Sequence, residues 1–188
     1  MSYCEEKFAE RSWFWSSLSL RINGQNLKYA HMANANLSNS NLNPLGYWVK
    51  SGETIVKNLI PYEHPSLDDD PGVFTPEVVS DLSFANLENA NLDNANLHWV
   101  IMTNTKLIQA NLSEVNLKRS NLQNSDFSGA VLSRADFTES DLRGAIFTGA
   151  DLRNASFANV LIENAIFSSV KNAPANFIEW AVKHGAIA

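Results

Sequence analysis

The stretch that decides the fold is Ala-Asn-Leu-Glu-Asn-Ala-Asn-Leu-Asp-Asn-Ala-Asn-Leu, residues 85–97, in which leucine returns at every fifth position. The same spacing extends from Leu82 to Phe177, where 19 of 20 central positions carry a large apolar residue and Asn172 is the break. Two places before each centre the residue is always small or β-branched, and it is alanine in 11 of 20 cases. The residue directly before each centre is Asn or Asp in 12 of 20 cases. A shorter block with the same period is centred on Ile22, Leu27, Met32, Leu37 and Leu42.

A period of five residues fits neither regular secondary structure. Five residues advance an α-helix by about 140°, which would spread the centres around its circumference. In a flat strand, successive centres would alternate between the two faces. A chain that turns a corner after every five residues points every centre inward, and four corners close one coil. The sequence therefore predicts a square coil of about 20 residues, stacked on its neighbours at the inter-strand spacing of about 4.8 Å.

This coil length predicts which interior side chains stack. Residues 20 apart fall on the same side, so Phe127, Phe147 and Phe167 form one ladder. Phe137, Phe157 and Phe177 form a second ladder on the opposite side. A third ladder consists of Leu92, Leu112, Leu132 and Leu152, and it ends at Asn172. The small residue before each centre indicates a narrow interior that a larger side chain would overpack.

The run at 85–97 and Gly-Ala-Asp-Leu-Arg at 149–153 resemble the pentapeptide-repeat family. The resemblance implies an all-β solenoid: a right-handed quadrilateral β-helix of about five to six coils, with short helical caps and one long inserted loop. We expect one structural domain with five parts. They are an N-terminal cap (1–20), a first pentapeptide-repeat block (21–42), an inserted loop (43–79), the main β-helix (80–177) and a C-terminal cap helix (178–188).

Both ends of the chain depart from the repeat. Ser2 followed by Glu5 predicts a capping box that opens a short helix. Trp13, Phe14 and Trp15 either cover the open end of the solenoid or dock on a partner or a membrane surface, and the lack of a cationic face favours the cap.

The C-terminal segment predicts a short helix after Pro174. It either seals the rod or, as the resemblance implies, mediates dimerisation. Apolar residues at outward positions near this end favour a dimer contact or a surface covered by the helix. The candidate contacts are Ile146, Leu161, Ile166 and Trp180.

The largest departure is residues 43–79, which contain five prolines. Gly52–Ile60 predicts a helix that Pro61 ends. The aromatic residues of the insertion indicate packing against the rod, and Phe84, Trp99 and Ile101 are the outward residues placed to receive it. The candidate interaction residues are Tyr47, Trp48, Tyr62, Asp68, Asp69, Asp70, Phe74 and Trp99.

Composition and charge exclude several classes of protein. The 188 residues carry a formal net charge of −6, which argues against a protein that binds nucleic acid through its phosphates. Residues 43–81 alone carry two positive and seven negative side chains, a net −5. One cysteine excludes an internal disulfide and a cysteine-built zinc site. The apolar runs are too short to span a bilayer, and the acidic N-terminus lacks the features of a secretory signal, so we expect a cytoplasmic protein.

The sequence shows no catalytic motif. The four histidines have no metal-ligand spacing, and His98 is expected to be a solvated surface group. Asp68-Asp69-Asp70 lacks the spacing of a calcium loop. We therefore expect no cofactor, no bound metal and no enzyme activity.

Three functions stand as hypotheses. The leading one is a noncatalytic bacterial scaffold that binds another protein, with the acidic aromatic insertion as recognition element and a homodimer through the C-terminal end. The alternative, implied by the resemblance, is a DNA-mimicking regulator of type II topoisomerase that protects gyrase from quinolones. Arg119, Arg134 and Arg143 interrupt the acidic stripe that such mimicry requires. The third, an enzyme that uses the insertion, has no residue-level support.

Overall fold

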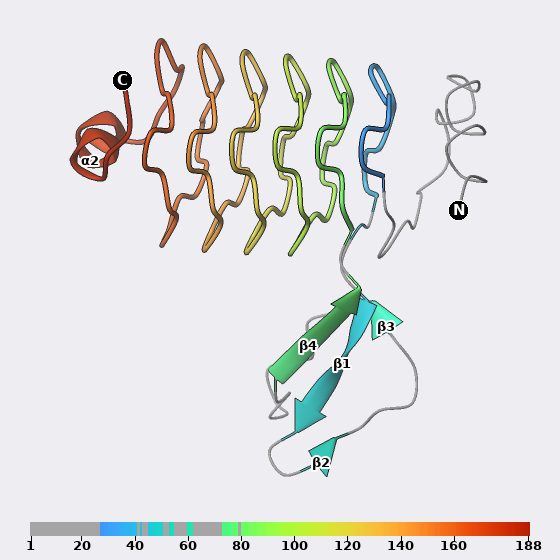
Figure 1. The fold of residues 1–188 in the computed structure, drawn as a ribbon. Coiled ribbons are helices and arrows are strands. Elements are labelled where there is room, and N and C mark those ends of the chain that lie inside the picture. The colour runs from blue at the N-terminus through green and yellow to red at the C-terminus, as the bar shows by residue number, and fades with distance from the viewer. Residues whose placement is uncertain are drawn as a thin grey trace.

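The repeat forms a four-sided rod in the computed structural model, which describes residues 27–40, 42 and 80–188 and the backbones of four short strands (Figure 1). Four parallel ladders run along the rod, and they pass through Asp81, Asn86, Asn91 and Asn96. Each ladder joins residues 20 apart in the main repeat. Backbone groups pair between coils, as Leu92 N–H does with Asn111 O at 2.7 Å. The square coil expected from the period of five is confirmed.

The corners explain why asparagine and aspartate are frequent in the repeat. The side-chain oxygen of the residue before a centre accepts the N–H two residues later, as Asn86 Oδ1 does from Glu88 N–H at 3.0 Å. This Asx turn bends the chain at the corner. For the centres from Leu82 to Phe167, the second residue after the centre adopts a positive φ, such as 57° at Asn104. Asparagine and glycine tolerate this left-handed conformation best.

The interior holds the predicted ladders. Phe127, Phe147 and Phe167 stack with centroids 4.9 and 4.7 Å apart, and Phe137 and Phe157 stack at 5.1 Å on the opposite side. Rings from the two ladders meet edge to face across the interior. Most inward serines and threonines of the main repeat are hydrogen-bonded: Ser120 Oγ donates to Leu97 O at 2.7 Å and Thr105 Oγ1 to Leu82 O at 2.8 Å, whereas Ser40 Oγ in the first block has no partner among the described residues. The hydroxyls bond to turn carbonyls of the preceding coil, so they are compatible with an apolar core.

The first repeat block stacks in register on the main rod, a point that the sequence leaves open. His31 pairs with Asn86 and Asn36 with Asn91, an offset of 55 residues instead of 20. The 35 extra residues (55 less 20) are seven units of five, so the insertion preserves the phase of the repeat. Leu82 is consequently the next centre after Leu42 along the coiled chain. Although 40 residues equal two coils of the main repeat, Leu42 and Leu82 therefore do not stack on each other.

The insertion contains a small antiparallel sheet beside the N-terminal coils (Figure 1). Its central strand is β1 (Leu45–Lys50), which pairs on one side with β4 (Val73–Val78) and on the other with β2 (Glu53–Thr54) and β3 (Ile60–Pro61). The helix expected at Gly52–Ile60 is wrong, because Glu53 and Thr54 pair with β1 and Ile60 begins β3. The apolar residues fit either period over so short a stretch.

The C-terminal end of the rod is closed by α2 (Phe177–Lys183). Phe177 is buried at 4.6 Å from Phe157, so the aromatic ladder continues into the helix. Beyond the helix the chain returns to the rod, where Ile187 pairs in parallel with Ile166. The helix expected from Pro174 onward is thus shorter and ends in a strand-like tail. The N-terminal cap expected at 1–20 lies outside the described residues.

Two glycines at equivalent corners provide a test of the corner geometry. Gly144 and Gly149 have φ of 69° and 70°, so alanine at either position incurs the same left-handed strain of about 1 kcal/mol. A Cβ at Gly144 would also overlap Asn124 Oδ1, whereas one at Gly149 meets nothing within 4 Å. We expect Gly144→Ala to lower the free energy of unfolding in urea more than Gly149→Ala does. Equal losses would contradict the close approach of Asn124.

Candidate functional site at the root of the insertion

The insertion leaves and rejoins the rod at one corner, which we call the insertion root: Leu42, Ser80, His98 and Trp99. Ser80 Oγ donates to Leu42 O at 2.9 Å, and both residues are buried. Leu42, the last described residue before the insertion, donates its N–H to Asn96 O at 2.9 Å, and Trp99 follows Asn96 on the same coil. Trp99 therefore lies where the recognition element predicted from the sequence joins the rod.

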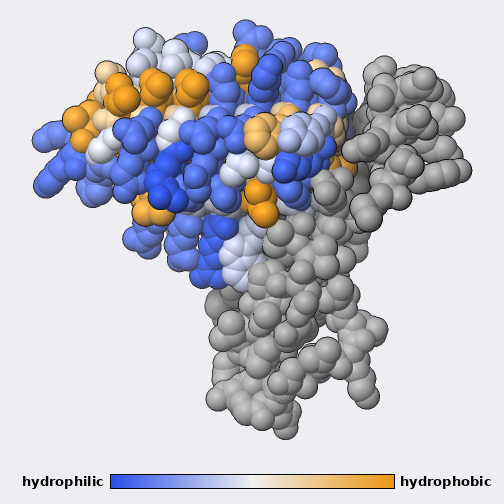
Figure 2. Space-filling model, in the orientation of Figure 1, coloured by the Kyte–Doolittle hydropathy of each residue, from blue (hydrophilic) through white to orange (hydrophobic). Residues whose placement is uncertain are grey.

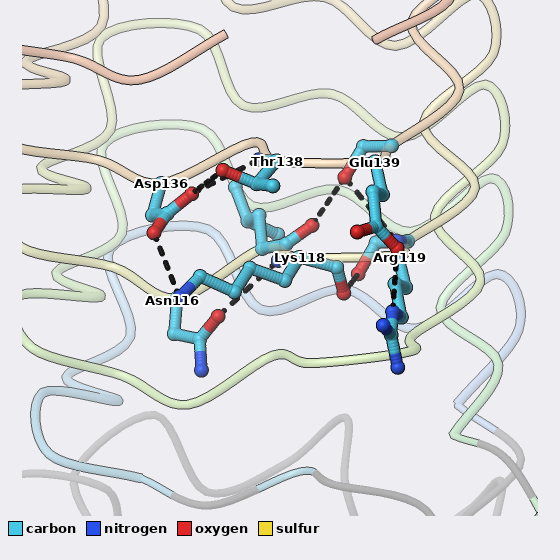
Figure 3. Close-up of polar contacts among 9 residues, drawn as sticks. Asn116, Lys118, Arg119, Asp136, Thr138 and Glu139 are labelled. Atoms are coloured by element: carbon cyan, nitrogen blue, oxygen red, sulfur yellow. Dashed lines mark hydrogen bonds and ion pairs between the residues drawn. The ribbon is translucent and has the colours of Figure 1, made fainter. Parts of the chain in front are cut away.

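Trp99 is the first of three side chains stacked along this corner of the rod, followed by Arg119 and Glu139. Arg119 stands 20 residues later, and its guanidinium carbon lies 5.5 Å from the centroid of the Trp99 ring. Arg119 Nε also donates to Glu139 Oε2 at 2.7 Å, as Figure 3 shows. An arginine held over an indole ring contributes a cation–π interaction, here fixed by the carboxylate on the next coil.

A second ion pair runs beside this column. Lys118 Nζ lies 3.0 Å from Asp136 Oδ2, and Asp136 Oδ1 accepts the backbone N–H of Thr138 at 3.0 Å (Figure 3). Burial opposes ionisation of Asp136, but the hydrogen bonds from Thr138 and Lys118 outweigh it and lower the pKa of the carboxyl. The cations next to the root are thus neutralised within the rod.

His98 is buried, which corrects the expectation of a solvated surface group. Its side chain is 4% exposed, and its ring lies 4.8 Å from that of Trp99. Burial and then the charges of Arg119 and Lys118 lower the pKa of His98 from 6.5 to about 4. The outward position in the repeat suggests exposure, but the environment at the root holds the imidazole neutral at pH 7.

Aromatic residues occupy an adjacent corner of the same coils. Tyr29 and Phe84 stack with centroids 5.1 Å apart and remain 62% and 46% exposed. Lys28 Nζ lies 5.5 and 5.6 Å from the two ring centroids. Both residues have a positive φ, of 62° and 61°, as does Trp99 with 58°. Among the described residues, these are the aromatic side chains in the left-handed conformation, and the other corners carry Asn, Gly, Gln, Glu, Arg or Ser.

The structure brings together some of the candidates predicted from the sequence. Tyr47 and Trp48 lie in β1 and Phe74 in β4, and Trp48 stands directly opposite Phe74 in the ladder. Tyr62, Asp68, Asp69 and Asp70 lie outside the described residues. Trp99 lies on the rod at the insertion root. Sequence reasoning missed Tyr29, although an aromatic residue at a corner position that elsewhere carries Asn, Gly or another polar residue is a signal that can be read from the repeat.

The candidates for a dimer or cap contact lie at the other end. Ile146 pairs with Ile166 on one side of the rod, and Leu161 is 47% exposed on a neighbouring side. Trp180 is half-buried in α2, with its ring 5.7 Å from Phe177 and 4.6 Å from His184. The structure thus does not gather the four residues in one surface. Ile146 and Ile166 share one side of the rod, Leu161 lies on a neighbouring side, and Trp180 belongs to α2.

Ion pairs neutralise most of the basic side chains of the main rod. Six of the seven Lys and Arg residues between 80 and 177 lie within 4.0 Å of a carboxylate. Within the described part of the chain, no three His, Cys, Asp or Glu residues gather as metal ligands. No helix there is long and apolar enough to cross a membrane.

The model of the pentapeptide-repeat family matches residues 80–168 with eight copies. The chain belongs to the pentapeptide-repeat family. The right-handed β-helix of that family is the fold that the resemblance implies, and its coils agree with the square coil that the period of five predicts.

Solved pentapeptide-repeat structures resemble this chain. Rfr23 from the cyanobacterium Cyanothece 51142 is 23% identical, with 88% of this chain and 95% of that chain covered and a TM-score of 0.47. The protein alr5209 from Nostoc Pcc 7120 is 33% identical over 54% of this pentapeptide-repeat chain and 83% of that one, with a TM-score of 0.47. Full-length QnrB1, a plasmid-mediated fluoroquinolone resistance protein, is 18% identical over 88% and 94%, with a TM-score of 0.25. A search of curated proteins found no match.

Proposed function

We propose that this pentapeptide-repeat protein is a noncatalytic scaffold that binds another protein at the insertion root, with the inserted sheet and its acidic segment as the recognition element. One observation carries the proposal. Tyr29, Phe84 and Trp99 hold the left-handed conformation at corners of the coils from which the insertion emerges. Two of them form an exposed stack.

The conformational cost of these aromatic corners supports a role in binding. A left-handed backbone costs an ordinary L-residue roughly 1–2 kcal/mol, which asparagine and glycine largely avoid. The repeat uses Asn104 and Asn124 at the corner that Phe84 occupies one coil earlier. Strained residues persist where another requirement selects them, and aromatic side chains dominate the energetics of protein interfaces.

The absence of catalysis is part of the proposal. The inward hydroxyls, such as Ser120 Oγ, donate to turn carbonyls within the rod. The outward aspartates Asp136 and Asp141 accept hydrogen bonds from their own corners and from cations of the rod. These groups serve the coil geometry, and none is paired as a nucleophile with a general base.

The topoisomerase alternative is less well supported. A DNA mimic requires continuous uncompensated negative charge along its length. Here the carboxylates of Glu114, Asp136 and Glu139 are neutralised by basic residues of adjacent coils. A gyrase supercoiling assay with and without quinolone checks this directly. Protection or inhibition at stoichiometric protein would favour the alternative over the scaffold.

The binding role is tested by changing Phe84 to the residue that the repeat itself uses. We expect Phe84→Asn to fold with a stability within about 1 kcal/mol of the wild type, because relief of backbone strain offsets the lost stack with Tyr29. It should nevertheless weaken capture of the partner at least tenfold. The measurement is quantitative affinity capture from source cells, followed by titration calorimetry with the protein identified.

Two further variants complete this experiment. Gln109→Asn alters another left-handed corner, with φ of 57°, and should bind as the wild type does. Replacing residues 45–79 with a short linker should abolish capture while the rod still folds. Unchanged binding by Phe84→Asn would remove the aromatic corner from the interface, and unchanged binding after the deletion would exclude the insertion as the recognition element.

A further inference from the structure

Two aromatic corners near the insertion root each hold a cation close to their rings. Lys28 Nζ lies 5.5 Å from the ring centroid of Tyr29 and 5.6 Å from that of Phe84. The guanidinium of Arg119 lies 5.5 Å from the ring centroid of Trp99, and a carboxylate of the next coil fixes it there. Lys28 is instead exposed, and a hydrated ammonium group at an exposed site gains little from an aromatic ring. The stacked rings therefore offer a cation site that a better-fitting cation can take over.

A carboxylate lies on the same side of the coil as this stack. Asp81 is half-buried three residues before Phe84, and its Oδ1 accepts the N–H of Ser83 at 2.8 Å. Its backbone oxygen accepts the N–H of Leu27 at 2.7 Å, on the coil that carries the lysine and the tyrosine. Among the described residues, no basic side chain lies within 4.0 Å of the Asp81 carboxylate. We give the name cation platform to Lys28, Tyr29, Asp81 and Phe84.

The charge around the cation platform is complementary to a basic partner. Residues 27–99 hold three Lys and nine Asp or Glu, a net −6, whereas residues 100–177 hold seven basic and seven acidic side chains. The negative charge is thus concentrated in the coils at the insertion root and in the insertion attached there. Figure 2 shows that the viewed face of the rod is mostly hydrophilic, with hydrophobic residues in small separate groups. This surface favours recognition by charge and by single rings over a broad apolar contact.

We propose that the cation platform binds an arginine from a basic, extended segment of the protein partner. This arginine site rests on the scaffold function proposed above, and it names the chemistry of the partner. The guanidinium displaces Lys28 from the rings of Tyr29 and Phe84 and pairs with Asp81. A planar, weakly hydrated guanidinium stacks on an aromatic face better than an ammonium group does. The acidic insertion attracts the neighbouring basic residues of the segment and speeds the encounter.

Fluorescence anisotropy with the full chain tests the arginine site. The probe is a short labelled peptide in which arginine alternates with glycine and serine, and matched peptides carry lysine or glutamate in place of arginine. We expect the arginine peptide to bind at least about threefold tighter than the lysine peptide, because the two have the same charge and only the guanidinium stacks well. The glutamate peptide should not bind. Raising the salt from about 50 to 500 mM should weaken the binding of both basic peptides.

Three variants locate the bound arginine. Phe84→Asn should lose most of the preference for arginine over lysine, because the ring is lost while the charge of the root remains. Lys28→Gln should bind the arginine peptide about threefold tighter than the wild type, because it removes the cation that competes for the rings. Lys183→Gln removes the same charge from an exposed residue in the last turn of α2 and should bind as the wild type does. Circular dichroism checks each fold, and if Phe84→Asn fails to fold, Tyr29→Asn decides.

The outcomes separate the arginine site from the scaffold function. Equal binding of the arginine and lysine peptides by the wild type would overturn the arginine site alone, and so would a preference that survives in Phe84→Asn. Binding by Lys28→Gln that is no tighter than binding by Lys183→Gln would overturn it as well, because Lys28 would then not occupy the place of the arginine. Unchanged capture of the partner by Phe84→Asn would overturn both the arginine site and the scaffold function at the root.

Discussion

Replacing Phe147 with alanine should lower the free energy of unfolding by about 3–5 kcal/mol. The Phe147 side chain is fully buried and stacks on Phe127 at 4.9 Å and on Phe167 at 4.7 Å. Its ring also meets Phe137 and Phe157 edge to face, at 5.9 and 6.1 Å. Truncation leaves a cavity with aromatic rings on two sides of it, and the hydrogen-bonded coils above and below restrict any collapse into the space.

Urea denaturation followed by circular dichroism measures this loss. Leu161→Ala is the matched control, because Leu161 is an apolar residue 47% exposed on a nearby coil, and it should cost no more than about 0.5 kcal/mol. Because each coil contacts mainly its neighbours, Phe147→Ala should also uncouple the C-terminal coils from the rest of the rod. A loss below about 1.5 kcal/mol would show that the aromatic ladder is less tightly packed than its geometry indicates.

The aromatic ladder also shows what the sequence makes predictable. Every coil of a solenoid has the same local geometry. A period of five residues and a coil of 20 therefore predict which residues lie in the interior and which of them stack. Phe127 and Phe147 stack because they are 20 apart, and no knowledge of distant contacts is needed. The Asx turns follow in the same way from the asparagine or aspartate before each centre, as at Asn86.

The insertion root was less predictable because it depends on contacts that no repeat encodes. Glu53 and Thr54 form a strand by pairing with β1, and a nine-residue apolar pattern does not reveal that partner. His98 occupies an outward position, yet it is buried next to Trp99. The register of the first block needed the backbone pairing of His31 with Asn86, since a gap of any multiple of five residues would preserve the same phase.

The environment of His98 predicts a stability that falls with acid over a defined range. Burial, together with the charges of Arg119 and Lys118, lowers the pKa of its imidazole to about 4, and the carboxylates of Glu139 and Asp136 offset only part of this lowering. In the unfolded chain the pKa returns to about 6.5. Between these values the unfolded state binds a proton that the folded state does not, so stability rises with pH. The contribution of His98 is complete above pH 6.5 and is lost as the pH falls toward 4, by about 3 kcal/mol in total.

Urea denaturation at closely spaced pH values between 4.5 and 7 isolates this effect. The carboxyls with lowered pKa, such as Asp136 and Asp141, lose their contribution only below their unfolded pKa of about 3.9, so they add little over this range. His98→Gln should remove most of the slope, because glutamine does not titrate. Leu161→Gln, which introduces the same side chain at a residue 47% exposed on another coil, should leave the slope unchanged. A slope that persists in His98→Gln would mean that His98 does not cause it, because His98 takes up its proton equally well in the folded state. Water would then screen the imidazole from Arg119 and Lys118, and the insertion root would be more open to water than the burial of His98 indicates.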